Sequence, residues 1–186
     1  KFKITLKIDR KFGDLLPFNY QYEQSAVIYR ILAQADTQYS SWLHENGYLL
    51  HERKRFKLFC YSPFIFEKVR PLPEAGCLKI IGERAVWYIS FIPEKSTLEF
   101  IQGIFAHQSF TIGNKKYQVA FDVVGVEAIP MPQLSEEMTF VALSPICVKL
   151  HEDNKTQYLS PDNPMFAEGV LKGLKAIYES IHGQSF

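Results

Sequence analysis

Three side chains in the first third of the sequence have the chemistry needed to break a phosphodiester bond. They are Tyr29, His44 and Lys57, and none of them fits the apolar pattern around it. A histidine titrates near neutral pH and can transfer a proton, and a lysine can stabilise a developing negative charge. A tyrosine, with a pKa near 10, is a poor proton acceptor, so base catalysis and orientation by hydrogen bonding both stay open for Tyr29. The three residues lack the spacing of metal ligands and suit proton transfer on a phosphodiester.

A helix beginning at Ser25 is predicted to carry Tyr29. Apolar residues recur at helical spacing and form its buried stripe: Val27, Ile28, Ile31, Leu32 and Ala35. At about 100° per residue, Tyr29 points about 130° away from the centre of that stripe. We therefore expect Tyr29 to face away from the core, although tyrosines are often half exposed for no functional reason.

A second, shorter helix over residues 37–46 is predicted to carry His44. Tyr39, Trp42 and Leu43 are spaced to face inward, and Gly47 follows where a C′ glycine is expected. His44 falls about 140° from that apolar centre, in the last turn, where free carbonyls favour the imidazolium. A plain surface histidine bonding those carbonyls is the alternative. The outer faces of the two helices could converge.

Lys57 begins a predicted strand over residues 57–66. A period of two places Lys57 on the same face as Phe59 and Tyr61. A lysine beside exposed aromatic rings could hold a nucleic-acid backbone while bases stack on the rings. In the alternative interpretation, the aromatic rings belong to the core and Lys57 marks the end of the strand.

The remaining elements of residues 1–129 predict a ferredoxin-like domain. Residues 2–8 alternate as a strand whose outer face carries Lys3 and Lys7. We expect a hairpin over residues 78–92 and then a helix over residues 94–107, whose inward residues are Leu98, Ile101, Ile104 and Phe105. Two strands then flank a Gly113-Asn114 turn. The order strand, helix, strand, strand, helix, strand is the βαββαβ pattern of an α+β fold.

Residues 130–138 are typical of a linker, and a second ferredoxin-like domain is expected over residues 138–186. A strand over residues 139–150, interrupted at Ser144-Pro145, precedes a helix over residues 164–182. The helix has an apolar stripe made of Phe166, Val170, Leu171, Leu174, Ile177, Tyr178 and Ile181. With only a first strand and a first helix, this domain is expected to be incomplete, so the functional unit should need further residues or another chain.

Composition narrows the class of protein without identifying a ligand. The 186 residues are 47% hydrophobic, enough for one or two compact cores, and no apolar run reaches the length of a membrane span. The net charge of +1 is no nucleic-acid signature, although residues 1–11 and 51–57 are basic. The cysteines, Cys60, Cys77 and Cys147, are expected to be buried, reduced thiols in the cytoplasm. The five histidines form no ligand pair, so neither a metal nor another cofactor is expected.

Several stretches, taken in order, resemble CRISPR-associated protein 6, the repeat-RNA processing endoribonuclease of the RAMP superfamily. They are AVIYRIL, YSSWLHENGY, KRFKLFCYS, VALSPICV and YLSPDNPMFAEGVLKGLKAIYE. The resemblance implies tandem RRM-like ferredoxin folds and one metal-independent cut within each CRISPR repeat. That cut leaves a 2′,3′-cyclic phosphate and a 5′-hydroxyl. It also implies catalytic roles for Tyr29, His44 and Lys57, with Lys54 as the alternative lysine.

The resemblance also guides the choice of RNA-binding residues and partners. The candidates are Lys3, Arg30, Arg53, Lys54, Arg55 and Tyr61. CRISPR repeat RNA is the expected partner, with other interference-complex subunits and a second copy of this chain as further candidates. The family's glycine-rich loop near the end of the second domain is absent from these 186 residues. Three rival functions are a non-catalytic RNA-binding RAMP subunit, a metalloenzyme and a ferredoxin-like domain for a small molecule.

Overall fold

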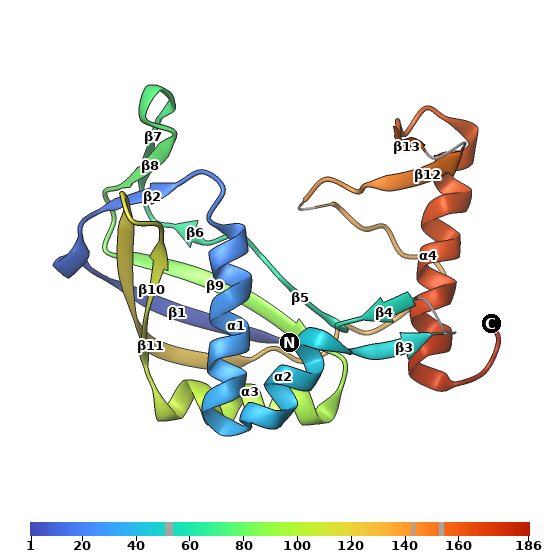
Figure 1. Ribbon diagram of the computed structural model, residues 1–186, viewed down its shortest axis with the longest axis horizontal. Helices are drawn as coiled ribbons and strands as arrows, with labels where there is room; N and C mark the ends of the chain where they lie inside the picture. Colours follow the sequence, from blue (N-terminus) through green and yellow to red (C-terminus); the bar gives the residue numbers. More distant parts are fainter. Residues whose placement is uncertain (51–53, 143, 153–154) are drawn as a thin grey trace. The chain divides into compact units, whose positions relative to one another are not determined.

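The chain forms two compact units in this computed structural model. The first unit is Lys1–Glu45 with Leu58–Pro132, and the second is Asn46–Lys57 with Gln133–Phe186. The structure describes residues 1–50, 54–142, 144–152 and 155–186. The fold is a mixed α+β fold, as predicted (Figure 1).

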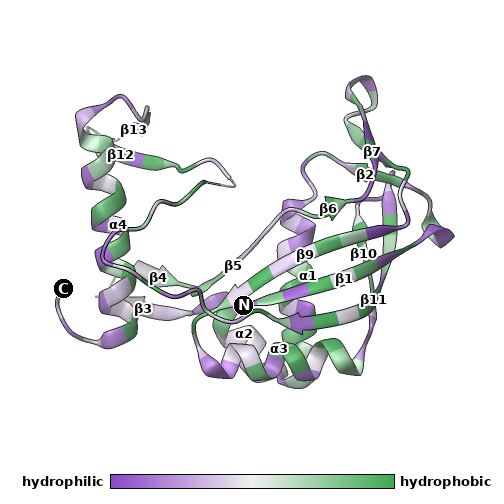
Figure 2. Ribbon diagram, turned by 180° about the vertical axis from the view of Figure 1, so that it is seen from behind, coloured by the Kyte–Doolittle hydropathy of each residue, from purple (hydrophilic) through white to green (hydrophobic). Residues whose placement is uncertain are grey.

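An antiparallel sheet forms the centre of the first unit. Its strand order is β10-β11-β1-β9-β5, and the short strand β6 also pairs with β9. The strands are β1 (Phe2–Asp9), β5 (Phe59–Tyr61), β6 (Ile65–Phe66), β9 (Arg84–Phe91), β10 (Ser109–Gly113) and β11 (Gln118–Ala128). Along β1 the buried Ile4, Leu6 and Ile8 alternate with outward residues, and Figure 2 shows this alternation in hydropathy. The strand predicted from period two is thereby confirmed.

Two helices complete the order predicted for the first unit. Helix α1 (Gln21–Ala35) follows β1, and α3 (Glu94–Ala106) follows β9. Counting β1, α1, β5, β9, α3 and β11 gives the predicted βαββαβ order, with β10 added at the sheet edge. Aromatic side chains fill the core: the Phe100 ring of α3 lies 6.4 Å from that of Trp87, and the Phe64 ring lies 4.8 Å from that of Phe121.

Gly103 lets α3 and α1 approach each other closely. A Cβ atom at Gly103 would lie 1.8 Å from the carbonyl oxygen of Ile31 on α1, so only glycine fits there. The buried stripe of α3 accordingly runs through Ser96, Phe100, Gly103 and Ile104. The predicted stripe was wrong at Leu98 and Phe105, which are 55% and 61% exposed. The prediction considered only large apolar residues, so it missed that the small residues Ser96 and Gly103 lie on the buried face of α3.

Replacing Gly103 with alanine is expected to lower the free energy of unfolding by about 3 kcal/mol, because the backbones of α1 and α3 must separate. Gly173 is a matched control, since it lies within a helix and a Cβ there would meet nothing within 4 Å. Gly173→Ala should leave the stability unchanged or raise it by up to about 1 kcal/mol. Urea unfolding of both variants measures the difference, and equal stabilities would contradict the packing argument.

A separate three-stranded sheet of order β2-β8-β7 projects from the first unit (Figure 1). Its strands are β2 (Leu15–Pro17), β7 (Val69–Leu72) and β8 (Cys77–Ile80). The 3-10 turn η3 (Pro73–Ala75) joins β7 to β8. The predicted hairpin over residues 78–92 is therefore wrong, because β8 pairs with β7 and β2 whereas β9 pairs within the central sheet.

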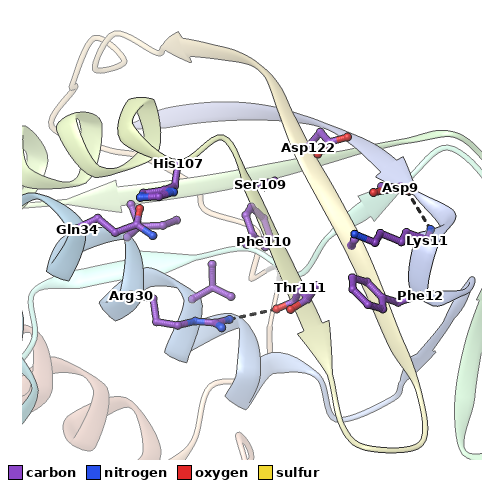
Figure 3. A pocket seen from close by; sticks show the side chains of 13 residues that line it. Asp9, Lys11, Phe12, Arg30, Gln34, His107, Ser109, Phe110, Thr111 and Asp122 are labelled. Carbon is purple, nitrogen blue, oxygen red and sulfur yellow. Dashed lines mark hydrogen bonds between the residues drawn. The ribbon is translucent and has the colours of Figure 1, made fainter.

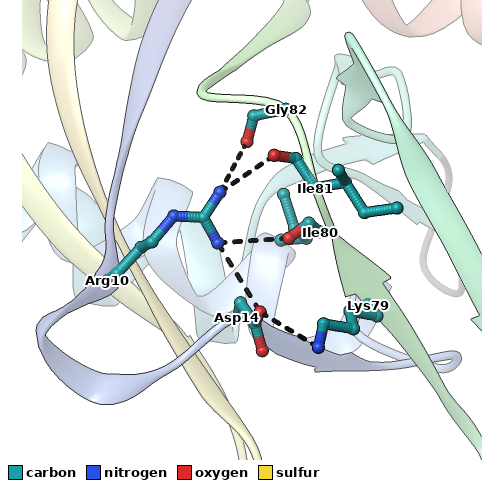
Figure 4. Close-up of polar contacts among 6 residues, drawn as sticks. All are labelled: Arg10, Asp14, Lys79, Ile80, Ile81 and Gly82. Carbon is teal, nitrogen blue, oxygen red and sulfur yellow. Dashed lines mark hydrogen bonds and ion pairs between the residues drawn. The ribbon is translucent and has the colours of Figure 1, made fainter.

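Arg10 fixes the segment that separates β8 from β9. It lies in the 3-10 turn η1 (Arg10–Phe12) that follows β1. Its guanidinium donates to the carbonyl oxygens of Ile80, Ile81 and Gly82 at 3.0–3.2 Å (Figure 4). Asp14 lies 3.6 Å from the same guanidinium. These four acceptors around the planar guanidinium fix the segment after β8. The chain therefore leaves the three-stranded sheet there and enters the central sheet at β9.

Among its described residues, the second unit has two antiparallel strand pairs and one helix. The strands are β3 (Tyr48–Leu50) with β4 (Lys54–Phe56), and β12 (Val148–Glu152) with β13 (Lys155–Leu159). Helix α4 (Pro164–His182) contacts both β3 and β12. The expectation of a single strand over residues 139–150 was therefore wrong: the strand begins at Val148, and β13 follows it. Pro145 has no backbone N–H to donate to a neighbouring strand, which accounts for the strand beginning only at Val148.

Helix α4 has the boundaries that its end signals predict. The side-chain Oδ1 of Asn163 accepts from the backbone N–H of Met165 at 2.9 Å, Pro164 stands in the first turn, and Gly183 ends the helix with φ of 65°. The apolar stripe is only partly covered. Ala176 is buried, whereas three members of the predicted stripe are exposed: Leu171 at 52%, Leu174 at 61% and Ile181 at 38%. The expectation that the stripe is buried was therefore wrong for these three residues.

Candidate active site

Tyr29 and His44 converge from successive helices of the first unit. Their ring centroids lie 4.9 Å apart, with the rings nearly perpendicular at 84°. Tyr29 lies in the middle of α1, and His44 lies in the last turn of α2 (Thr37–Glu45). The Ser40 hydroxyl of α2 donates to the carbonyl oxygen of Tyr29 at 2.8 Å, which ties the two helices together at this point. The outer faces of the two helices, which the sequence suggested could converge, do meet at Tyr29 and His44.

The start of α2 is fixed by Asp36 and Tyr39, and this fixes the helix that carries His44. The Asp36 carboxylate accepts from the backbone N–H of Tyr39 at 2.8 Å and lies 3.1 Å from the Lys95 ammonium. The hydrogen bond from Tyr39, followed by that from Lys95, lowers the pKa of Asp36. The Tyr39 hydroxyl also shares a buried hydrogen bond with Ser96 of α3. Helix α2 is thus anchored to both neighbouring helices.

Two sequence-based details of these helices need correction. Helix α1 begins at Gln21, four residues before the predicted Ser25, and α2 ends at Glu45. Trp42 was expected to face inward but is 39% exposed, and its ring stacks on Tyr39 at 5.8 Å. The inward position belongs instead to Ser40, which is buried. Ser40 lies three residues before Leu43, and this spacing is the sequence feature that could have identified it.

An aromatic row extends from His44 through Tyr29 to strand β5. The Phe59 ring lies 5.7 Å from that of Tyr29, and the Tyr61 ring lies 6.4 Å from that of Phe59. The Tyr61 hydroxyl donates to the carbonyl oxygen of Gln21 at 3.0 Å. Tyr29 is consequently half-buried: it lies off the buried stripe of α1, as predicted, and its outer face packs against Phe59. Strand β5 covers this side of α1.

Burial raises the pKa of Tyr29, with a smaller contribution from the Tyr61 hydroxyl. The ordinary tyrosine pKa already lies near 10, so the Tyr29 phenol is neutral at physiological pH. A neutral phenol donates a hydrogen bond far more readily than it accepts a proton. Of the two roles left open for Tyr29, orientation by hydrogen bonding therefore fits better than base catalysis. His44, by contrast, is exposed at the end of its helix.

Lys57 does not lie on a strand, contrary to the sequence-based expectation. Leu58 has φ of 54°, a left-handed conformation that interrupts the extended chain between β4 and β5. The period-two argument, which placed Lys57 on the face of Phe59 and Tyr61, fails at this residue. Lys57 belongs to the second unit, where its side chain covers Gly47: a Cβ there would lie 3.4 Å from Nζ of Lys57.

Gly47 is required both by its backbone and by its neighbours. Its φ of 66° confirms the C′ glycine predicted after α2. A Cβ at this position would also meet the carbonyl oxygen of Phe56 at 2.7 Å. The glycine at position 47 therefore makes room for Phe56 and Lys57, the two residues just before Leu58.

The predicted RNA-binding residues have different surroundings. Lys3 pairs with Glu127 at 2.9 Å, and the hydrogen bond and charge of Glu127 raise its pKa. Arg30 donates to the carbonyl oxygen of Thr111 at 3.1 Å. Tyr61 belongs to the aromatic row beside Tyr29. Lys54 and Arg55 lie on β4, but their side chains, like the whole of Arg53, fall outside the described residues. The RNA contacts of all six residues stay predictions.

Cys77 is buried as expected, whereas Cys60 and Cys147 are exposed, contrary to expectation. Among the described residues, no group of three or more His, Cys, Asp or Glu side chains is arranged to hold a metal ion. Within the same parts of the chain, no helix combines the length and apolar character needed to cross a bilayer.

Comparison with known proteins finds one family over nearly the whole chain. Residues 15–122 match the family described as CRISPR-associated protein Cas6, N-terminal, and residues 129–185 match CRISPR-associated protein Cas6, C-terminal. The sequence is similar to CRISPR-associated endoribonuclease Cas6 1 of Methanocaldococcus jannaschii, with 27% identity over 98% of this chain and 67% of that protein.

Two further proteins from Pyrococcus furiosus are similar. CRISPR-associated endoribonuclease Cas6 is 24% identical over 94% of this chain and 61% of its own length. The solved structure of the product of a Cas6-related gene has a TM-score of 0.78 and 24% identity, covering 100% of this chain and 72% of that one. The chain thus spans about two thirds of the length of the curated relatives that it matches. Because the family matches more than half of the residues, the chain belongs to the CRISPR-associated protein Cas6 family.

Proposed function

We propose that this protein is an endoribonuclease that cleaves CRISPR repeat RNA within the precursor transcript to release guide RNAs. The observation that carries the proposal is the contact between Tyr29 and His44, which joins a proton-transfer group to a hydrogen-bond donor on two anchored helices. The names of the curated relatives, CRISPR-associated endoribonucleases, support the same activity. The proposed site of action is the cytoplasm.

The proposed reaction uses the RNA's own 2′-hydroxyl as the nucleophile. Its oxygen attacks the adjacent phosphorus and loses its proton, the bond from phosphorus to the 5′-oxygen breaks, and that oxygen is protonated. The products are a 2′,3′-cyclic phosphate and a 5′-hydroxyl, and no metal ion is required. His44 is exposed and can reach an RNA backbone, so we assign it one of the two proton transfers. Tyr29 orients the reacting group, and Lys57 stabilises the charged transition state.

Cleavage of the cognate repeat is expected to persist in excess EDTA and to yield these two ends. The measurement uses end-labelled repeat RNA from the genome that encodes the protein, with product ends identified by phosphatase and kinase treatment. A substrate with one 2′-deoxyribose at the cut site serves as the control and should stay intact. Loss of activity in EDTA, or cleavage of the deoxy substrate, would refute the mechanism. Tight binding without any cleavage would favour the rival function of a non-catalytic RNA-binding subunit.

A further inference from the structure

A cavity of about 390 Å³ lies in the first unit at the free edge of the central sheet. Strand β10 is the last strand of that sheet, and α1, η1 and the end of α3 contribute the other walls (Figure 3). Arg30 faces the cavity and directly follows Tyr29 on α1, so the two side chains point about 100° apart. The cavity is therefore separate from the contact between Tyr29 and His44.

The cavity presents hydrogen-bonding groups of both charges. Arg30 uses one N–H on the carbonyl of Thr111, and a guanidinium has five N–H donors, so others can reach a ligand. On β11, Asp122 is half-buried, and its carboxylate has no hydrogen bond or ion pair with any described residue. Ser109 stands opposite Asp122 in the strand register, so a hydroxyl and a carboxylate share one face. A half-buried carboxylate of this kind favours a ligand that brings N–H donors.

An aromatic ring is available at the same cavity. Phe12 lines it from η1 and is 51% exposed, so part of its ring is accessible to a ligand. The ammonium of Lys11 lies 5.5 Å from the centre of the Phe12 ring. An exposed ring with an adjacent cation is the arrangement on which proteins stack a base while they hold its phosphate.

We propose that this cavity binds one unpaired ribonucleotide whose base carries an exocyclic amino group. The base stacks on Phe12, its amino group donates to Asp122, and the phosphate contacts Arg30 and Lys11. A purely anionic ligand would be repelled by Asp9 and Asp122, and a purely apolar one would leave the charged groups without partners. The inference rests on the proposed function, because it assigns a second contact to the same RNA. The contact adds affinity and base preference away from the cut bond.

The test measures binding of fluorescein-labelled octaribonucleotides A8, C8 and U8 by fluorescence anisotropy. Wild type should bind A8 and C8 more tightly than U8, because uracil has no amino group. Phe12→Ala should weaken binding of A8 about tenfold through lost stacking. Asp122→Asn should remove the preference for A8 and C8 over U8. Matched controls are Phe105→Ala, another exposed phenylalanine, and Glu99→Gln, since both residues lie on α3 outside the cavity.

The outcomes separate this inference from the proposed function. Folded Phe12→Ala and Asp122→Asn proteins that bind all three oligomers like their controls would overturn the cavity assignment, even if wild type cleaves repeat RNA. If wild type cleaves no repeat but shows the predicted oligomer preferences, the nuclease assignment fails and the cavity assignment stands. Thermal unfolding establishes that each variant is folded, and Phe12→Leu provides a second variant that keeps apolar bulk without the flat ring.

Discussion

Replacing His44 with alanine is expected to slow repeat cleavage about 10²-fold or more while repeat affinity changes only a few-fold. The imidazole lies at the exposed end of α2 and is not part of the buried core, so its loss should remove a proton transfer without a loss of stability. The anchors of α2 at Asp36, Tyr39 and Ser40 do not involve His44. The measurements are a single-turnover cleavage rate, a repeat-binding titration and the midpoint of thermal unfolding.

His182 offers a matched control for that experiment. It also lies in the last turn of a helix, α4, and its ring is 4.2 Å from that of Tyr178, so it too has an aromatic neighbour. His182→Ala should cleave repeat RNA at the wild-type rate. If His44→Ala cuts at a near-normal rate, His44 has no role in the chemistry. If the variant melts far below wild type, His44 acts in stability and the assignment to chemistry alone is refuted.

The features predicted correctly from sequence are those set by residues close together in the chain. Helical spacing located α1, α2, α3 and α4, and the Gly113-Asn114 turn joins β10 to β11 as expected. Asn114 also accepts from the backbone N–H groups of Lys116 and Tyr117, which stabilises that turn. Gly47 and Gly183 both have the left-handed conformation expected after a helix.

The features that sequence did not predict depend on distant parts of the chain. The separation of β8 from β9 requires Arg10, some 70 residues earlier, to bind three carbonyls in the turn. The buried face of α3 is set by the approach of Ile31 to Gly103, which no periodicity within α3 reveals. In each case, a contact over a long sequence distance outweighs the local apolar pattern.

The same distinction applies to the candidate active site. Helical geometry placed Tyr29 and His44 on outward faces of successive helices, and these faces do converge. Tyr29 is half-buried because it packs against Phe59, thirty residues later in the chain. The helical spacing around Tyr29 could not predict this contact. The positive φ of Leu58 interrupts the extended chain, so the prediction that Lys57 begins a strand was wrong. Proton-transfer chemistry can thus be recognised from residue types, whereas the surroundings that tune it need the fold.

Lys57→Ala is expected to reduce the cleavage rate about 10²- to 10³-fold, the usual effect of removing one group that stabilises transition-state charge. Within the second unit, the side chain of Lys57 passes over Gly47, so it is held against the backbone, as a charge-stabilising group requires. Lys54→Ala, which removes the same charge three residues earlier, is the comparison. It should weaken repeat binding a few-fold and leave the single-turnover rate within a few-fold of wild type, because a backbone contact contributes affinity alone.

Lys57→Arg completes the series, because it keeps the positive charge but replaces a compact ammonium with a planar fork. Partial recovery of the rate, with repeat affinity equal to wild type, would indicate that charge at this position stabilises the transition state. If Lys54→Ala carries the large loss of rate and Lys57→Ala does not, the catalytic lysine is Lys54. If neither variant loses more than a few-fold in rate, charge stabilisation comes from elsewhere, and the lysine role implied by the family resemblance does not hold for this chain.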